Sequence, residues 1–481
     1  MTGEALQSRI ETGVSGADDV LHGGMLEGSA TLIRGAPGAG KTIFGLHYAT
    51  TTRDPDATNL YINLGEPSSY LGRTAEAFEL PTDRVEFLDL SPSGDQFRRS
   101  ESYDLFSADE VETPSLVASI REQVESHSPE RVVIDPITEL RYLAPDERQF
   151  RTQVLSLLDF LKDSGTTVLL TSQAAESIVD DDLQFLVDSV LELDLRADRR
   201  TLSVSKFRGS GARRGRHTVT IGGDGMCVWP RLDPSKHERE GELNTLSSGV
   251  PDLDALLGGG VTTGTITFLS GPTGVGKTTT GMQFMKEAAK NGDRSVLYSF
   301  EEAERTMLDR ADAIGIPARE MISDGNLVIE EISPEALTID EFTHRIRSEI
   351  EDEGAEIVMI DGVSGFERAF RGLEDDPESH LVNIGRYLRN MNVTGLVTNE
   401  VHGITGEFRA TERNVSHLAD SIVVFRHVEY RGELRKVIGM LKRRTGDFQH
   451  GLRIFEITED GLHLGEQPSD LRGILTGTPE W

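Results

Sequence analysis

The stretch ATLIRGAPGAGKT covers residues 30–42, and TITFLSGPTGVGKT covers residues 265–278. Each is a run of apolar, strand-forming residues that opens directly into a glycine-rich turn ending in Lys-Thr. Both turns fit the pattern G-x-x-x-x-G-K-[ST], in which glycines let the backbone wrap around a phosphate. The residues predicted to bind nucleotide are Gly35, Ala36, Pro37, Gly38, Ala39, Gly40, Lys41 and Thr42 in the first copy and Gly271, Pro272, Thr273, Gly274, Val275, Gly276, Lys277 and Thr278 in the second.

The two turns predict ATP and Mg²⁺ as ligands. Backbone N–H groups and the positive end of the following helix attract phosphate. Lys41 and Lys277 are expected to neutralise the β and γ phosphates, and the hydroxyls of Thr42 and Thr278 are placed to ligate Mg²⁺. A single match can be a chance glycine turn, but two matches between a strand and a helix argue against chance.

The rest of the chain repeats around these turns. Lys277 follows Lys41 by 236 residues, and the lead-ins SGADDVLHGG and SGVPDLDALLGGG are expected to form a turn before each P-loop strand. Strands and helices alternate after each P-loop, and Asp188 and Asp420 mark corresponding points in the repeat. The repeat predicts an α/β protein with two P-loop domains, each a mostly parallel sheet flanked by helices.

Composition suggests the domain limits. The predicted domains are residues 1–230 and 246–465. Residues 231–245 are polar and without apolar periodicity, which is typical of an interdomain linker. Residues 466–481, EQPSDLRGILTGTPEW, are a poor candidate for core, and we expect a mobile tail or a docking segment there.

The whole chain has a globular composition, with 481 residues, 37% of them hydrophobic and 27% charged. No apolar run approaches the length needed to span a bilayer, and the N-terminus lacks a signal-peptide core, so we expect a cytoplasmic protein. The single cysteine, Cys227, excludes an internal disulfide and a cysteine metal cluster. The net charge of −32 is spread along the chain, which indicates a solvated surface adapted to high salt and makes nucleic acid an unexpected partner.

Aspartates end corresponding strands in the two halves. Asp135 ends RVVID and Asp361 ends EIVMID. Because ligands of parallel sheets bind at the carboxyl ends of the strands, both carboxylates are predicted to hold the Mg²⁺ water shell. The alternative is that each aspartate only caps the following turn.

Glutamates form a second acidic position. Glu66 and Glu302 each stand 25 residues after the P-loop lysine, and both follow a strand. A carboxylate there can orient or deprotonate an attacking water or hydroxyl, so Glu66, Glu301 and Glu302 are predicted catalytic residues. The second half has the pair Glu301 and Glu302, whereas the first has Gly65 and Glu66. Surface glutamates that open a helix are the alternative.

Basic residues late in each half form a third set. KFRG supplies Lys206 and Arg208, and LKRRTG supplies Lys442 and Arg444. Two residues apart on a strand, each pair faces one side and can reach a nucleotide phosphate across a subunit boundary, as arginine fingers do. A solvated strand edge, where lysine discourages aggregation, is the alternative.

Taken together, the two P-loop halves, the paired lead-ins, the FEE after the second strand, the IDG acid and the K-x-R strand ends resemble the double-domain KaiC family of RecA-like ATPases. The resemblance covers nearly the whole chain, and the acidity makes it most similar to archaeal members. It implies two tandem RecA-like P-loop NTPase domains and a two-tiered homohexamer that binds ATP between subunits.

The resemblance also implies a signalling or timing switch with serine/threonine autokinase activity in the second domain. The family's adjacent Ser-Thr acceptor pair falls on Ser416 and His417, so Ser416 is the candidate phosphosite and Glu301 the base by analogy. Gln184 and Phe185 stand at the matching positions of the first half, where no acceptor is expected. Gly65 replaces one of the family's paired glutamates, which implies that hydrolysis in the first domain relies on Glu66 alone.

Two other functions remain open. A RecA- or RadA-like nucleic-acid-binding ATPase finds local support in GARRGRH, where Arg213, Arg214 and Arg216 cluster, although no aromatic residues interleave with them. The third function is a nucleotide-gated scaffold that hydrolyses little and recruits regulatory proteins through its C-terminal tail. Both P-loops keep the lysine, the threonine and an acid, and the sequence shows no sign of lost chemistry.

Overall fold

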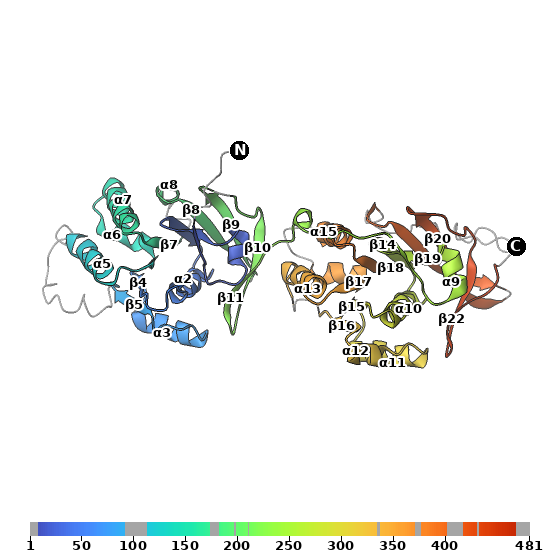
Figure 1. The fold of residues 1–481 in the computed structure, drawn as a ribbon. Helices are drawn as coiled ribbons and strands as arrows, with labels where there is room; N and C mark the ends of the chain where they lie inside the picture. The colour runs from blue at the N-terminus through green and yellow to red at the C-terminus, as the bar shows by residue number, and fades with distance from the viewer. Residues whose placement is uncertain are drawn as a thin grey trace. The chain divides into compact units, whose positions relative to one another are not determined.

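The computed structural model of the chain describes residues 8–91, 113–173, 182–196, 199–209, 211–333, 337–370, 377–401, 417–430 and 432–467. The chain divides into two compact units, Met1–Arg231 and Leu232–Trp481 (Figure 1). Each unit carries a nine-stranded sheet and a separate two-stranded sheet. The repeated sequence therefore gives a repeated fold.

The large sheet of the first unit has the strand order β11-β10-β9-β8-β3-β7-β6-β4-β5. Its strands are β3 (Ala30–Gly35), β4 (Asn59–Asn63), β5 (Val85–Asp89), β6 (Arg131–Asp135), β7 (Thr167–Gln173), β8 (Ser189–Arg196), β9 (Arg199–Phe207), β10 (Arg216–Gly222) and β11 (Gly225–Trp229). The strands from β5 to β8 in this order pair in parallel, and β9, β10 and β11 continue the sheet as antiparallel strands. The P-loop strand β3 lies inside the parallel part, between β7 and β8.

The second unit repeats this topology, with the order β16-β15-β17-β18-β14-β19-β20-β21-β22. Its strands are β14 (Ile266–Gly271), β15 (Arg294–Ser299), β16 (Leu327–Glu331), β17 (Ala355–Asp361), β18 (Thr394–Glu400), β19 (Ser421–Tyr430), β20 (Glu433–Arg443), β21 (Arg453–Thr458) and β22 (Gly461–Leu464). Again the P-loop strand, β14, lies between two parallel neighbours. The predicted fold class, two tandem RecA-like domains with mostly parallel sheets, is confirmed.

Helices cover both faces of each sheet. In the first unit they are α1 (Ala17–Val20), α2 (Lys41–Thr50), α3 (Ser68–Ala77), α5 (Thr113–His127), α6 (Leu140–Leu143), α7 (Glu147–Asp163) and α8 (Leu183–Leu186). In the second they are α9 (Pro251–Leu257), α10 (Lys277–Lys290), α11 (Glu304–Ala313), α12 (Ala318–Ser323), α13 (Ile339–Glu351), α14 (Val363–Ala369) and α15 (Pro377–Asn390). In the parts of the chain that the structure describes, none of these helices has the length and apolar composition to cross a membrane.

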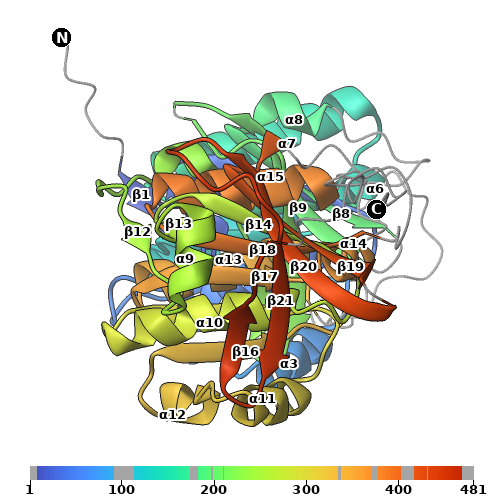
Figure 2. The same ribbon diagram turned by 90° about the vertical axis from the view of Figure 1, so that its right-hand side faces the viewer.

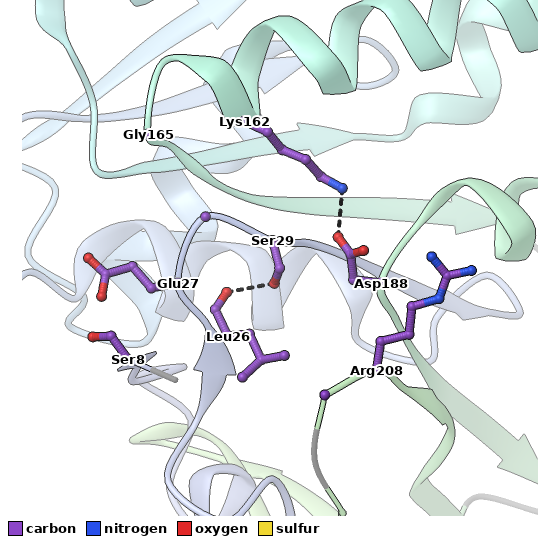
Figure 3. A pocket seen from close by; sticks show the side chains of 10 residues that line it. Ser8, Leu26, Glu27, Ser29, Lys162, Gly165, Asp188 and Arg208 are labelled. Atoms are coloured by element: carbon purple, nitrogen blue, oxygen red, sulfur yellow. Dashed lines mark hydrogen bonds and ion pairs between the residues drawn. The ribbon is translucent and has the colours of Figure 1, made fainter. Parts of the chain in front are cut away.

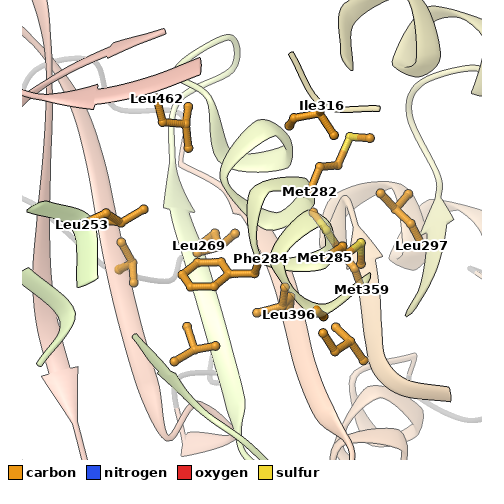
Figure 4. Packing of buried hydrophobic residues seen from close by; sticks show 14 of the residues in the cluster. Leu253, Leu269, Met282, Phe284, Met285, Leu297, Ile316, Met359, Leu396 and Leu462 are labelled. Carbon is orange, nitrogen blue, oxygen red and sulfur yellow. The ribbon is translucent and has the colours of Figure 1, made fainter. Parts of the chain in front are cut away.

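Each large sheet carries an extensive apolar core on each of its two faces. In the second unit α9 to α12 pack over one face, where Leu253, Met282 and Phe284 meet Leu269 and Leu396 of the strands (Figure 4). Helices α13 to α15 pack over the other face. Figure 2 shows the strands β14, β17 and β18 between α15 on one side and α10 on the other. The first unit has the same two cores, so each sheet is a rigid platform for its P-loop.

Two features of the fold differ from the sequence-based expectation. The outer strands β5 and β16, which the sequence analysis did not single out, pair in parallel with β4 and β15. Each lead-in was expected to be a turn, yet each contains a short helix, α1 or α9. Along the chain, this helix lies between the two strands of a small antiparallel sheet. That sheet pairs β1 (Arg9–Ile10) with β2 (Met25–Leu26), and β12 (Thr245–Leu246) with β13 (Val261–Thr262).

The segment predicted as a linker packs on the second unit from residue 234 onward. The Asn390 side-chain amide donates to the Pro234 carbonyl at 2.7 Å, and Arg239 pairs with Glu356 at 3.1 Å. Polar residues of this segment are therefore held by the second unit, while the exact limits of the linker and of the two domains stay predictions.

Candidate nucleotide-binding sites

Each P-loop joins the carboxyl end of its strand to the start of a helix. Gly40 and Gly276 precede helices α2 and α10 with φ angles of 109° and 114°. A Cβ atom would lie 2.5 Å from Met226 Cε at Gly40 and 2.7 Å from Ile457 Cδ1 at Gly276. Only glycine fits there, because both the left-handed backbone and the close neighbour exclude a side chain. The loop amides and the helix N-terminus therefore form a phosphate cradle.

The P-loop lysines lie along the inner side of their loops. Lys41 Nζ donates to the Gly35 carbonyl at 2.8 Å, and Lys277 Nζ donates to the Gly271 and Pro272 carbonyls at 2.9 Å. Burial lowers the pKa of both lysines, and nearby carboxylates oppose the shift. A buried ammonium over a loop of N–H groups can be compensated by the negative charge of a triphosphate.

The two strand-ending aspartates are buried, at 7% exposure for Asp135 and 6% for Asp361, but they have different partners. Asp361 accepts hydrogen bonds from the Thr278 hydroxyl at 3.0 and 3.1 Å and from the Thr398 hydroxyl at 2.7 Å. Burial raises the pKa of Asp361, while these hydroxyls and Lys277 lower it. The P-loop threonine and the acid thus face the same point, as an Mg²⁺ site requires.

Asp135 of the first unit accepts from Thr171, which stands at the strand position of Thr398, but it accepts from Tyr61 in place of the P-loop threonine. The buried Tyr61 hydroxyl lies 2.6 Å from Asp135 Oδ2, and Thr171 donates to Oδ1. Burial and the Asp135 carboxylate raise the pKa of Tyr61, so the phenol stays a donor. Tyr61 pairs with Val133, two residues before Asp135, and Leu297 pairs with Met359, two residues before Asp361. Leu297 therefore takes the place of Tyr61 in the second unit.

The paired glutamates of the second unit point to different neighbours. The Glu301 side chain lies against Gly362, where a Cβ atom would be only 2.8 Å from Glu301 Cδ, and it pairs with Arg368 at 3.4 Å. Burial, followed by Glu400 and Asp361, raises the pKa of Glu301. Glu302 forms an ion pair with Arg310 of α11 at 2.8 Å. Of the two predicted carboxylates, Glu301 is therefore the one held beside Asp361 and the P-loop.

The first unit has no carboxylate at the position of Glu301. Gly65 stands there, and a Cβ atom on it would lie 3.0 Å from Pro136 Cδ. Glu66 is exposed at the start of the α3 segment. The Asn63 side-chain amide donates to the Glu66 carbonyl and fixes the backbone of this turn.

The four predicted trans-acting basic residues lie at the amino ends of the parallel strands, which is the edge opposite the P-loops. Strand β9 runs antiparallel to β8, so Phe207 pairs with Ser189, near the start of the P-loop strand. From there to the P-loop is the length of β3, about 17 Å. Lys206 Nζ donates to the Gln184 and Val187 carbonyls at 2.7 and 2.6 Å. These residues are too far to reach the nucleotide of their own domain.

The second unit repeats this arrangement. Lys442 Nζ donates to the Ala419 carbonyl at 2.6 Å, and Arg444 pairs with Asp420 at 3.2 Å. Burial, and then the neighbouring arginine in each pair, lowers the pKa of Lys206 and Lys442. Asp420 also pairs with Arg389 at 2.9 Å. Cations thus surround one aspartate at this edge of both units.

A cavity of about 640 Å³ lies at this edge of the first unit. Lys162 and Asp188 point toward each other across it at 2.7 Å, with Arg208 beside them (Figure 3). Its other lining residues are Ser8, Leu26, Glu27, Gly28, Ser29, Gly165 and Gly209. Although burial opposes it, hydrogen bonds from Ala30 N–H and Lys162 lower the pKa of Asp188. The carboxylate therefore stays charged and fixes the cations around it.

Among the described residues, sequence reasoning missed five that contact the P-loops or their acids, two of which are Thr171 and Thr398. Arg200 of β9 donates to the Gly38 carbonyl at 3.3 Å, Glu400 of β18 accepts from the Thr273 hydroxyl, and Tyr61 covers Asp135. Glu400 could have been found, because it ends the strand beside the P-loop strand, opposite Gly271. The contacts of Arg200 and Tyr61 depend on sheet register and had no local signal.

The loop of Arg213, Arg214 and Arg216 is held within the first unit. The Arg213 N–H donates to the Val20 carbonyl at 2.8 Å, and Arg216 lies 3.9 Å from Asp194. The backbone of Arg213 and the side chain of Arg216, the first residue of β10, thus both have partners in the first unit.

Two P-loops on tandem parallel sheets, each with its lysine and strand-ending acid, define a tandem RecA-like P-loop ATPase. A sequence model of the KaiC ATPase family matches residues 10–233 and again residues 246–469. The chain belongs to this KaiC family of ATPases.

Known relatives cover almost the whole chain. The circadian clock oscillator protein KaiC of Prochlorococcus marinus is 28% identical over 494 residues, which cover 98% of this chain and 95% of the relative. The circadian clock protein KaiC3 of Synechocystis sp. is 28% identical over 487 residues, covering 98% of this chain and 94% of the relative. KaiC of Thermosynechococcus vestitus is 27% identical, covering 98% and 92%.

Proposed function

We propose that this chain is a Mg²⁺-dependent ATP-driven switch in which Lys41 and Lys277 each bind the phosphates of one ATP. The observation that carries the proposal is the contact of Thr278 with Asp361 at 3.0 Å beside the half-buried P-loop lysine Lys277. A hydroxyl and a carboxylate converge there on the place where a P-loop enzyme holds its metal. The metal would neutralise charge on the phosphates.

The residues of the second unit fit Mg²⁺ better than those of the first. Thr278 and Asp361 already face each other, and both supply hard oxygen atoms. In the first unit Thr42 and Asp135 would hold the ion, but one Asp135 oxygen accepts from Tyr61. Thr171 donates to the other oxygen, so each Asp135 oxygen already accepts a hydrogen bond from a residue outside the P-loop.

We propose that the chain assembles into a ring, with six copies as the resemblance implies, and places Lys206, Arg208, Lys442 and Arg444 on the neighbour's ATP. What supports this is their position at the edge opposite the P-loops, repeated in both units. A ring of identical contacts joins one edge of a subunit to the other edge of the next. Regulatory proteins that bind residues 466–481 would read the state of the ring, and the cytoplasmic location stays a prediction.

We propose serine autokinase activity for the second domain, which would make the chain a signalling or timing switch. The relatives named as circadian clock proteins support this reading. Ser416, the candidate acceptor, lies outside the described residues. Glu301 is the carboxylate available near Asp361 to accept the proton of an attacking hydroxyl.

Incubation with γ-labelled ATP tests this function. Released phosphate is expected to require Mg²⁺ and to disappear in Lys41→Ala/Lys277→Ala, because both phosphate ligands are lost. Label on the protein should map to Ser416 and vanish in Ser416→Ala. Label absent from Ser416 in the wild type would remove the kinase part and leave the ATPase.

Mixing two inactive variants tests the trans contacts. Lys277→Ala keeps the basic residues, and Lys442→Ala/Arg444→Ala keeps the P-loop, so mixed rings contain some intact sites at their boundaries. Equal mixing should restore roughly a quarter of the second-domain turnover. No restoration in rings shown to exchange subunits would assign the basic residues to structure only.

A further inference from the structure

The two P-loop compartments differ at the second residue after strands β4 and β15, beside the strand-ending acid. The N–H of Leu64 donates to the Asp135 carbonyl, and the N–H of Phe300 donates to the Asp361 carbonyl, so the next residues, Gly65 and Glu301, occupy equivalent places. One compartment therefore has a carboxylate beside its acid, and the other has none at this position.

The residue that follows the strand-ending acid also differs between the units, with Pro136 in the first and Gly362 in the second. Glu301 lies on Gly362, whose missing side chain leaves room for it, since a Cβ there would be 2.8 Å from Glu301 Cγ and Cδ. Gly65 lies against Pro136, and a Cβ atom on Gly65 would be 3.0 Å from Cδ of the proline ring. In each unit a glycine faces a larger residue. In the second unit the glycine follows the strand-ending acid, and in the first unit it stands at the position of Glu301. A glutamate at position 65 alone would have to displace the proline ring.

The neighbouring glutamate does not fill the gap. Glu66 is equivalent in register to Glu302, and Glu302 turns to Arg310 of α11. Consecutive residues after a strand point in different directions. Glu66 therefore stands at the position that the second unit uses for an ion pair with α11, and not at the position of Glu301.

The charge around the lysines differs as well. Among the described residues, Glu400, Asp361 and Glu301 oppose the lowering of the Lys277 pKa by burial, whereas Asp135 opposes that of Lys41. Glu400 also accepts from Thr273 of the P-loop, whose counterpart Pro37 has no hydroxyl to donate. More negative charge beside a polyanion weakens its binding.

We infer that the second compartment is the turnover site and that the first is a retentive ATP site with slow hydrolysis. This rests on the proposed binding of ATP at both lysines. In the second compartment the water oxygen bonds to the γ-phosphorus while the bond to the β,γ-bridging oxygen breaks, and that electron pair leaves with ADP. The water proton passes to the Glu301 carboxylate, which releases it to solvent. The first compartment lacks this acceptor and binds ATP more tightly.

Glu301→Gln tests the catalytic side. It should lower steady-state ATP turnover at least about 100-fold while the protein still binds ATP. Glu304→Gln, the same change at an exposed residue three positions later, is the matched control and should stay within about twofold. Turnover of Glu301→Gln near the wild-type value would overturn the inference.

Moving the glutamate to position 65 of the first unit should give a gain of ATP turnover, which a misfolded variant would not show. In the Glu301→Gln background, Gly65→Glu with Pro136→Gly should raise turnover at least about tenfold. Gly65→Glu alone should gain less, because Pro136 occupies the space. A gain from neither combination, with folding and ATP binding intact, would contradict the role given to this position.

Bound nucleotide tests the retentive side. After rapid removal of free nucleotide, wild-type protein should keep ATP that Lys41→Ala loses and Lys277→Ala retains. ATP retained equally in both single variants would overturn the assignment of compartments. If Lys41→Ala/Lys277→Ala still binds ATP, the proposed function itself fails, which separates that outcome from failure of the inference.

Discussion

The first and second P-loop compartments share everything that binds a phosphate and differ in what surrounds it. Both have a central parallel strand, a glycine at positive φ before the helix, and a lysine folded onto the loop carbonyls. Around Asp135 stand Gly65, Pro136 and Tyr61, whereas around Asp361 stand Glu301, Gly362 and Leu297. Duplication has kept the cradle, and a few contact residues set the chemistry.

The two strand-ending aspartates also differ in the hydroxyl group that donates a hydrogen bond to them. The Tyr61 phenol occupies an oxygen of Asp135, while the corresponding acid in the second unit meets Thr278 of its own P-loop. An aspartate that ends the same strand can thus be tied to a core tyrosine or to the threonine of its P-loop.

The largest contrast is expected when the two acids are changed. Asp361→Asn should reduce ATP turnover at saturating Mg²⁺ and ATP at least about 100-fold, because its charge completes the metal site of the turnover compartment. Asp135→Asn should have the smaller effect on turnover and the larger effect on retained ATP. Phosphate release and nucleotide content measure the two. Equal loss of turnover in both variants would argue for equal compartments.

A smaller effect is expected from filling the space under Glu301. Gly362→Ala puts a Cβ 2.8 Å from that side chain and should lower turnover about tenfold by displacing it. Gly354→Ala is the matched control, since its φ of 74° carries similar strain but nothing lies within 4 Å. Each alanine should lower the free energy of unfolding by about 1 kcal/mol, measured by denaturant titration. Equal turnover in both variants would break the contact argument.

The first compartment should respond to removal of the Tyr61 hydroxyl. Tyr61→Phe, made in the Lys277→Ala background, should lower the Mg²⁺ concentration needed for ATP binding about threefold, because Asp135 Oδ2 loses its hydrogen bond to the phenol while Oδ1 keeps the one from Thr171. Stability should fall by about 1 kcal/mol. Tyr48→Phe removes another buried hydroxyl, bonded to the Thr167 carbonyl at 3.2 Å, and should leave the Mg²⁺ dependence unchanged. A similar shift in both variants would contradict a role at Asp135.

The smallest effect is a shift in pH dependence. Glu301 must be deprotonated to accept a proton, and its pKa is raised, so turnover should fall as pH drops through this raised pKa. Arg368 lowers the pKa of Glu301. Arg368→Gln should therefore move the acid limb of the pH-rate profile upward by about 0.3 pH unit. Arg305→Gln on α11 is the control, and a downward shift in Arg368→Gln would count against Glu301 as the base.

The sequence predicted the platform of each site well, and the contacts within it poorly. The spacing of the repeated P-loops placed Asp135 and Asp361 at strand ends, and the parallel sheets follow from the alternating strands and helices. The edge strand β5 was missed because its exposed Glu86 interrupts the apolar pattern. Pro136 facing Gly65, and Tyr61 facing Asp135, arise from pairing between segments distant in sequence, which local patterns do not encode.

Binding of a non-hydrolysable ATP analogue, measured by calorimetry with Mg²⁺, tests the central claim most directly. Two sites per chain are expected in the wild type, the tighter one lost in Lys41→Ala and the weaker one lost in Lys277→Ala. The double variant should take up no analogue. Unchanged uptake in the folded double variant would show that neither lysine holds a triphosphate.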